Sequence, residues 1–110
     1  MILIIGGNNQ GKLEYAKARF SDYEIFDNLH EYIKSELKNS KNENEITKEI
    51  LIYAQKVKQV IICDEIGNGI VPIIDEDRKW REITGRILID LAARAEEVHR
   101  VVCGIGKRIK

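Results

Sequence analysis

The chain begins MILIIGGNNQGKLEYAKARF, residues 1–20, and this stretch decides the fold. Its continuous apolar run, residues 1–5, stops at two glycines, which is typical of a strand buried on both faces of a parallel sheet. The residues after the glycines are good helix formers, and Leu13, Ala16 and Phe20 give them one apolar face. Strand, glycine turn and helix, in this order, are what a phosphate-binding loop needs.

The turn GGNNQGKL, residues 6–13, matches the phosphate-loop pattern G-x-x-x-x-G-K, except that leucine stands where the full pattern has serine or threonine. Glycines let the backbone amides turn inward, the helix N-terminus adds a favourable field, and Lys12 supplies charge to phosphate oxygens. We therefore expect a phosphate ligand here. The residues expected to contact it are Gly6, Gly7, Asn8, Asn9, Gln10, Gly11, Lys12 and Leu13. The alternative is a glycine-rich turn without a ligand, in which Lys12 is a solvated lysine.

Two residues bear on a metal ion. The hydroxyl missing at Leu13 is the group that normally ligates Mg²⁺, a cation that binds oxygen atoms, so its absence argues against metal-assisted phosphoryl transfer. Asp27 follows a short predicted strand, residues 23–26, at the sheet edge where ligands bind, and could hold a metal-bound water. An N-cap of the following helix is an equal alternative for Asp27.

Strands and helices alternate along the rest of the chain. The predicted elements are strands at 60–63 and 98–103, helices after residue 27, at 46–57 and at 76–95, and a polar surface connection at 38–45. This alternation predicts right-handed crossovers and a mostly parallel sheet of roughly four strands with helices on its faces. The predicted fold is α/β, a three-layer sandwich of the P-loop NTPase (RecA-like) type, in a single domain over residues 1–110.

Composition narrows the function classes. Eighteen basic and eighteen acidic side chains cancel, so nothing points to nucleic acid or an anionic membrane as a partner. No apolar run reaches the roughly 18 residues that span a bilayer, and the N-terminal run is too short for a signal peptide, so we expect a cytoplasmic protein. Cys63 and Cys103 lie in apolar runs without a metal-ligand motif, and we expect both to be buried, reduced thiols. The basic residues at the end, Lys107, Arg108 and Lys110, are expected to form a solvated terminus.

A second candidate ligand segment is CDEIGNGIVP, residues 63–72. Asp64 and Glu65 are two carboxylates at the end of a predicted strand, and Gly67 and Gly69 allow a tight, exposed loop after them. The alternative is a plain connection between strand and helix.

Both histidines and the tryptophan have ordinary structural interpretations. His30 and His99 have no nucleophile or metal-ligand spacing, and we expect surface or half-buried positions for them. Trp80 belongs to the apolar stripe of the helix at 76–95, which predicts packing in the core or at a subunit interface rather than a stacking platform for a ligand.

Four stretches resemble a known family. They are GGNNQGK near the N-terminus, DEIGNGIVP, the helix DRKWREITGRILIDLAARAEEV and the ending VVCGIGKRIK. Over residues 59–110 the chain resembles the N-E-V-G-x-G-I-V-P, R-x-[FW]-R-[DE]-x-x-G-R and G-[IL]-P-x-x-[IL]-K patterns of the adenosylcobinamide kinase/adenosylcobinamide-phosphate guanylyltransferase family of cobalamin biosynthesis. Residues 1–20 resemble that family's phosphate loop and first helix, and YEIFDNLHEYI resembles its strand with the aspartate of V-D-C-L-T.

The resemblance implies a function. It implies a P-loop protein that binds a purine nucleotide, ATP or GTP, and transfers a phosphoryl group to the hydroxyl of the corrinoid cobinamide. By this resemblance Lys12 and Asp27 are the catalytic residues, Lys12 neutralising phosphate and Asp27 holding Mg²⁺ through water, with Glu65 near the nucleotide. The family also implies a homo-oligomer, a trimer.

The chain departs from the family pattern at several positions. The family segment that bears the guanylylated histidine has no counterpart between Arg19 and Tyr23, and His30 stands at the threonine of V-D-C-L-T. We therefore expect guanylyl transfer by the family route to be lost. The other departures are Leu13, Asp64 in place of asparagine, Leu88 and Ile89 in place of a polar pair, and Gly106 in place of proline.

Two alternatives to an active kinase come from other classes of protein. One is a degenerate nucleotide-binding or interaction module that kept the scaffold and lost turnover, which Leu13 and the missing segment favour. The other is a structural homo-oligomer without a nucleotide, in which Ile70, Val71 and Ile73 form a contact surface.

Overall fold

The computed structural model describes residues 1–66 and 74–110, and their order of elements is the one that the sequence predicts up to residue 102. In this part of the chain the strands are β1 (Ile2–Gly6), β2 (Glu24–Phe26), β3 (Gln59–Asp64), β4 (Glu97–Val102) and β5 (Ile105–Arg108). The helices are α1 (Lys12–Arg19), α2 (Leu29–Lys38), α3 (Glu43–Ala54) and α4 (Asp75–Arg94). The residues that we considered for an exposed loop and a contact surface, Gly67, Gly69, Ile70, Val71 and Ile73, lie outside the described residues.

The strands form one sheet in the order β2-β3-β1-β4-β5. The first four are parallel, because a helix returns the chain to the same end of the sheet before each new strand. Strand β1 lies in the centre, and its last residue, Gly6, pairs with Asp64 of β3 and with Val101 of β4. The phosphate loop therefore leaves the sheet at the carboxyl edge, between its two neighbouring strands.

The C-terminal strand β5 runs antiparallel to β4, so the sheet has one strand more than the four expected. Cys103 and Gly104 both adopt positive φ, 51° and 78°, which is the backbone of a tight two-residue hairpin turn. The backbones of Lys107 and Arg108 accordingly pair with β4, which the sequence did not predict, while their side chains are exposed, as expected for a solvated terminus. Lys110 is also bound, since its ammonium donates to the carbonyls of Ala92 and Ala93 at the end of α4, at 2.8 and 3.0 Å.

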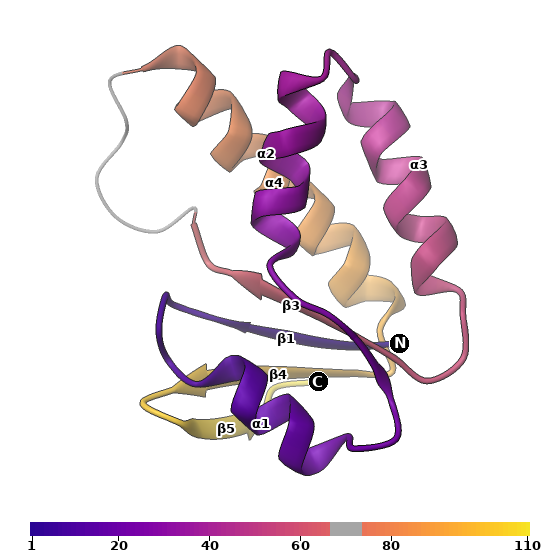
Figure 1. The fold of residues 1–110 in the computed structure, drawn as a ribbon, viewed down its shortest axis with the longest axis vertical. Helices are drawn as coiled ribbons and strands as arrows, with labels where there is room; N and C mark the ends of the chain where they lie inside the picture. The colour runs from indigo at the N-terminus through magenta and orange to yellow at the C-terminus, as the bar shows by residue number, and fades with distance from the viewer. Residues whose placement is uncertain (67–73) are drawn as a thin grey trace.

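Helices cover both faces of the sheet, which confirms the three-layer α/β architecture (Figure 1). Of the described helices, α1 covers one face, and α2, α3 and α4 cover the other. Alternate residues of β1 face opposite layers: Ile2 and Ile4 pack with α1, whereas Leu3 packs with the three-helix layer. Complete burial of such a side chain stabilises the fold by about 1.5–3 kcal/mol.

Helix α3 begins three residues earlier than its apolar pattern predicts. The side chain of Asn42 accepts a hydrogen bond from the backbone N–H of Glu45 at 2.9 Å, so Asn42 is the N-cap. The polar connection is therefore limited to residues 39–42 between α2 and α3. None of the helices in the described ranges is long and apolar enough to cross a membrane.

Candidate functional site

The phosphate loop lines a pocket of about 200 Å³ at the carboxyl edge of the sheet. Two positions of the loop can only be occupied by glycine without strain. A Cβ on Gly6 would lie 2.5 Å from the carbonyl oxygen of Val101 on the neighbouring strand, and Gly11 precedes α1 with a φ of 86°. The residues that line the pocket are Asn8, Asn9, Gln10, Gly11, Lys12, Leu13, Glu14, Asp27, Asn28 and Asp64.

Lys12 is the first residue of α1, and its side chain turns back over the loop. It is only 8% exposed, and its ammonium donates to the carbonyl of Gly7 at 2.5 Å and lies 2.7 Å from Oδ1 of Asp64. A buried ammonium costs free energy unless it is paired, and these two acceptors supply the pairing. A single positive charge is thus held at the mouth of the loop, where it could neutralise a phosphate.

Asp64, which the sequence placed in a second candidate ligand segment, lines the phosphate-loop pocket itself. It ends β3 opposite Gly6, its side chain is 16% exposed, and it faces Lys12. The next residue, Glu65, turns elsewhere: its N–H donates to the carbonyl of Gly6, and its carboxylate lies 3.2 Å from Nε of Arg100. The register of β3 against β1 is the signal that separates these two neighbouring carboxylates.

Asp27 lines the same pocket, at the start of the segment that leads into α2. Its Oδ1 accepts the backbone N–H of Asn28 at 2.8 Å, and Asn28 itself is the residue that precedes the helix. The position of Asp27 agrees with the sequence prediction of a carboxylate at the carboxyl edge of the sheet. Its role as a metal-side ligand stays a prediction.

A metal ion in this pocket would need ligands besides the described side chains. In the described ranges no group of three or more histidine, cysteine or carboxylate side chains could hold one. The pocket does bring together the carboxylates of Asp27 and Asp64, and Mg²⁺ is commonly held by one or two carboxylates together with phosphate oxygens. These residues therefore fit a cation that arrives with a triphosphate, and Leu13 supplies no oxygen to it.

Both histidines are buried, which corrects the expectation of surface or half-buried positions. His30, 6% exposed, accepts the backbone N–H of Asp64 on Nδ1 at 3.1 Å, and its Nε2 lies 3.4 Å from Oδ2 of Asp64. His99 is fully buried, with Nδ1 2.7 Å from the hydroxyl of Tyr15 and Nε2 2.8 Å from Glu97. The hydrogen bond to His99 lowers the pKa of the Glu97 carboxyl.

The β4–β5 turn supports the phosphate loop from outside. The backbone N–H groups of Cys103 and Gly104 donate to the side-chain oxygen and the carbonyl of Gln10, at 2.8 and 2.7 Å. Cys103 is exposed, which corrects the expectation that both thiols are buried. Cys63 is buried as expected, and burial, assisted by the neighbouring charge of Asp64, raises the pKa of its thiol to about 12.

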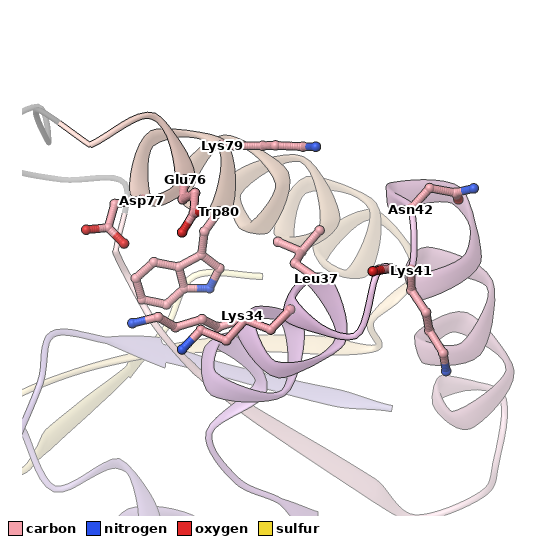
Figure 2. Close-up of a pocket in the computed structure, with 10 residues that line it drawn as sticks. Lys34, Leu37, Lys41, Asn42, Glu76, Asp77, Lys79 and Trp80 are labelled. Carbon is pink, nitrogen blue, oxygen red and sulfur yellow. The ribbon is translucent and has the colours of Figure 1, made fainter.

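A second, larger hollow of about 550 Å³ lies between α2 and the start of α4 (Figure 2). Its central side chain is Trp80, whose ring faces the ammonium of Lys34 at 4.7 Å and whose indole N–H donates to the carbonyl of His30 at 2.8 Å. Trp80 also packs against the three-helix core, as its apolar stripe predicts. The other charged residues around the hollow are Lys38, Lys41, Lys79, Glu76 and Asp77.

The comparisons with known proteins all find the same family. The sequence profile of CobU, described as cobinamide kinase / cobinamide phosphate guanyltransferase, matches residues 18–109. The bifunctional adenosylcobalamin biosynthesis proteins CobU of Escherichia coli (strain K12) and Salmonella typhimurium (strain LT2) are each 49% identical over 53 residues. The match covers 48% of this chain and 29% of each relative, so the chain corresponds to under a third of their length. The phosphate loop precedes the residues that the family profile covers.

Proposed function

The chain belongs to the CobU family of cobinamide kinases / cobinamide phosphate guanyltransferases, and on that premise we propose that it binds ATP or GTP at its phosphate loop and phosphorylates cobinamide in cobalamin biosynthesis. The observation that carries the proposal is the position of Lys12. Its ammonium lies at the carboxyl edge of a parallel sheet, above a turn whose glycines are required by geometry.

Phosphoryl transfer needs little covalent chemistry from a protein, because positioning and charge neutralisation provide most of the catalysis. In this proposal Lys12 neutralises the phosphate oxygens, and the loop amides at the start of α1 orient them. Asp27, which lines the same pocket, would hold Mg²⁺ through a water molecule. Glu65 acts less directly, since its N–H binds the carbonyl of Gly6 and so fixes the end of β1.

We also propose that guanylyl transfer through a histidine is lost. The sequence contains only two histidines, and a covalent nucleophile must present a free nitrogen to its substrate. His30 and His99 are both buried, and the protein's own groups lie against both ring nitrogens of each. After incubation with radiolabelled GTP we expect no covalent label on the chain, and label on either histidine would contradict this part of the proposal.

The binding step is tested by calorimetric titration with ATP and with GTP, in the presence of Mg²⁺. We expect binding, and we expect Lys12→Ala to weaken it by at least about tenfold because it removes a charge-assisted contact to phosphate. Lys17→Ala, an exposed lysine on the same helix, is the matched control and should bind as the natural protein does. Equal affinities of the Lys12→Ala and natural proteins would exclude the phosphate loop as the site.

A second candidate is a nucleotide-binding or homo-oligomeric module without turnover. The absence of a metal-ligating hydroxyl at Leu13 favours it. Release of ADP or GDP in the presence of cobinamide distinguishes the two proposals, since a binding module would show the calorimetric signal and no product. Sedimentation of the purified protein would report whether it assembles as a homo-oligomer, such as the trimer that the family resemblance implies.

A further inference from the structure

The phosphate-loop pocket holds more negative than positive charge. Among the described residues that line it, Glu14, Asp27 and Asp64 carry carboxylates and Lys12 carries the one ammonium. That ammonium is already paired with Asp64 at 2.7 Å. A bare triphosphate would meet like charge at short range, and in a partly buried site such repulsion is poorly screened by water.

Asp64 is also fixed where it stands. Its backbone N–H donates to Nδ1 of His30, which leaves the proton of the neutral ring on Nε2, 3.4 Å from Oδ2 of Asp64. Both carboxylate oxygens thus face a nitrogen, Lys12 on one side and His30 on the other. The carbonyl of His30 is in turn held by the indole N–H of Trp80 from α4. The carboxylate cannot swing out of the pocket without breaking these contacts.

We propose that Asp64 makes nucleotide binding at this loop dependent on a divalent cation, because its carboxylate competes with the triphosphate for Lys12 unless a cation bound with the triphosphate offsets the charge of that carboxylate. The inference rests on the proposed function, since it concerns the same site. It gives a specific role to a position at which this chain has aspartate and the family pattern has asparagine. His30, another departure from that pattern, is the positioning residue that holds the carboxylate in place.

The inference predicts that the affinity for ATP depends strongly on Mg²⁺, whereas the missing hydroxyl at Leu13 by itself predicts a weak dependence. A loop without its hydroxyl should bind little better in Mg²⁺, because one oxygen ligand is missing. A pocket with a fixed carboxylate against its lysine should instead bind a metal–triphosphate complex far better than the bare triphosphate. The metal dependence of affinity therefore separates the two expectations.

The test is calorimetric titration of ATP into the natural protein and into Asp64→Asn, each in excess Mg²⁺ and in EDTA. The natural protein should bind at least about tenfold more tightly with Mg²⁺ than in EDTA, because the cation replaces a repulsion between carboxylate and phosphate with an attraction to both. Asp64→Asn frees Lys12 without changing side-chain shape, so in EDTA it should bind about tenfold more tightly than the natural protein. The ratio of the affinities in Mg²⁺ and in EDTA should be clearly smaller in this variant than in the natural protein, and the part that remains belongs to Asp27 and Glu14, which also line the pocket.

Asp22→Asn is the matched control, because it makes the same chemical change in an exposed carboxylate that pairs with Lys58 away from the loop. It should leave both affinities unchanged, and circular dichroism should show that each variant is folded. Unchanged or weaker binding by Asp64→Asn in EDTA would overturn the inference while Lys12-dependent binding of the natural protein left the proposed function standing. Absence of binding by every protein in both conditions would overturn the two together.

Discussion

Two hollows in the described part of the chain differ in the groups that line them. The phosphate-loop pocket, about 200 Å³, lies where parallel strands end, and backbone and buried charge line it. The hollow beside Trp80, about 550 Å³, lies between two helices, and lysine and acidic side chains surround it. One of those lysines, Lys41, is already neutralised by Glu36 and Glu49 at 2.7 and 2.6 Å. Volume alone would have selected the hollow beside Trp80 rather than the phosphate-loop pocket.

The largest expected effect comes from substituting two glycines, one at the phosphate loop and one inside α4. Gly6→Ala would place a Cβ 2.5 Å from a backbone oxygen of β4, and we expect it to destabilise the protein by about 2–4 kcal/mol or to prevent folding. Gly85→Ala, inside α4 with open space around it, should stabilise by about 0.5–1 kcal/mol. Urea unfolding of both variants measures the difference. Similar stabilities would mean that β1 and β4 are not in close contact at the loop.

The two thiols extend the comparison to reactivity. Cys103 is exposed in the turn that supports the phosphate loop, whereas Cys63 is buried under the three-helix layer with a pKa of about 12. The thiolate reacts, so iodoacetamide at pH 8 should alkylate Cys103 at least about a hundredfold faster than Cys63. Peptide mass spectrometry over a time course gives the two rates, and urea should abolish the difference. Comparable rates in the folded protein would contradict the burial of Cys63.

Leu13→Ser sharpens the description of the smaller pocket. It restores an oxygen ligand beside the phosphates, and we expect it to raise affinity for ATP in Mg²⁺ by about threefold, within the range of one added polar contact. In EDTA the variant should match the natural protein, because Lys12 and the loop amides act without metal. Identical affinities in Mg²⁺ would show that residue 13 does not reach the metal.

Lys34→Ala should have the smallest effect on ATP affinity and on stability, so it serves as a control for the location of the nucleotide. Lys34 lies against the ring of Trp80 in the larger hollow and is not among the described residues that line the phosphate-loop pocket. We expect its affinity for ATP to equal that of the natural protein and its stability to fall by no more than about 1 kcal/mol, the strength of an exposed cation–π contact. A loss of affinity similar to that of Lys12→Ala would indicate that the nucleotide binds in the larger hollow.

The sequence predicted most of the fold correctly where one element contains its own signal. The apolar runs that became β1 and β3, and the stripe of Ile83, Ile87 and Leu91 in α4, were visible because period and composition are local properties. Strand β5 was missed because its residues, Ile105–Arg108, are short of an apolar run and largely exposed. Only the positive φ at the preceding turn, and pairing with β4, make this segment a strand.

The candidate site divides in the same way. Gly6, Gly11 and Lys12 were assigned from a motif, since the backbone angles and the charge of a phosphate loop are encoded in seven adjacent residues. The choice of Asp64 over Glu65 as the lysine's partner could not be made from the sequence. It depends on the register between β3 and β1, which sets which of two adjacent carboxylates faces the loop.

The burial of the histidines belongs to tertiary structure as well. His30 meets Asp64 across 34 positions of sequence, and His99 meets Tyr15 across 84. The glycine at position 106 is explained by the same tyrosine, because the ring of Tyr15 fills the space where a Cβ would lie. No periodic pattern in the sequence predicts any of these contacts.

By itself, then, the sequence determined the α/β class, the place of the phosphate loop and the lysine in it, because propensity, apolar period and glycine geometry act between near neighbours along the chain. The tertiary structure alone decided which charges face that lysine. Strand register and helix packing bring Asp64, His30 and Trp80 together from three separate elements, and electrostatic interactions depend on distance in space rather than on separation in sequence.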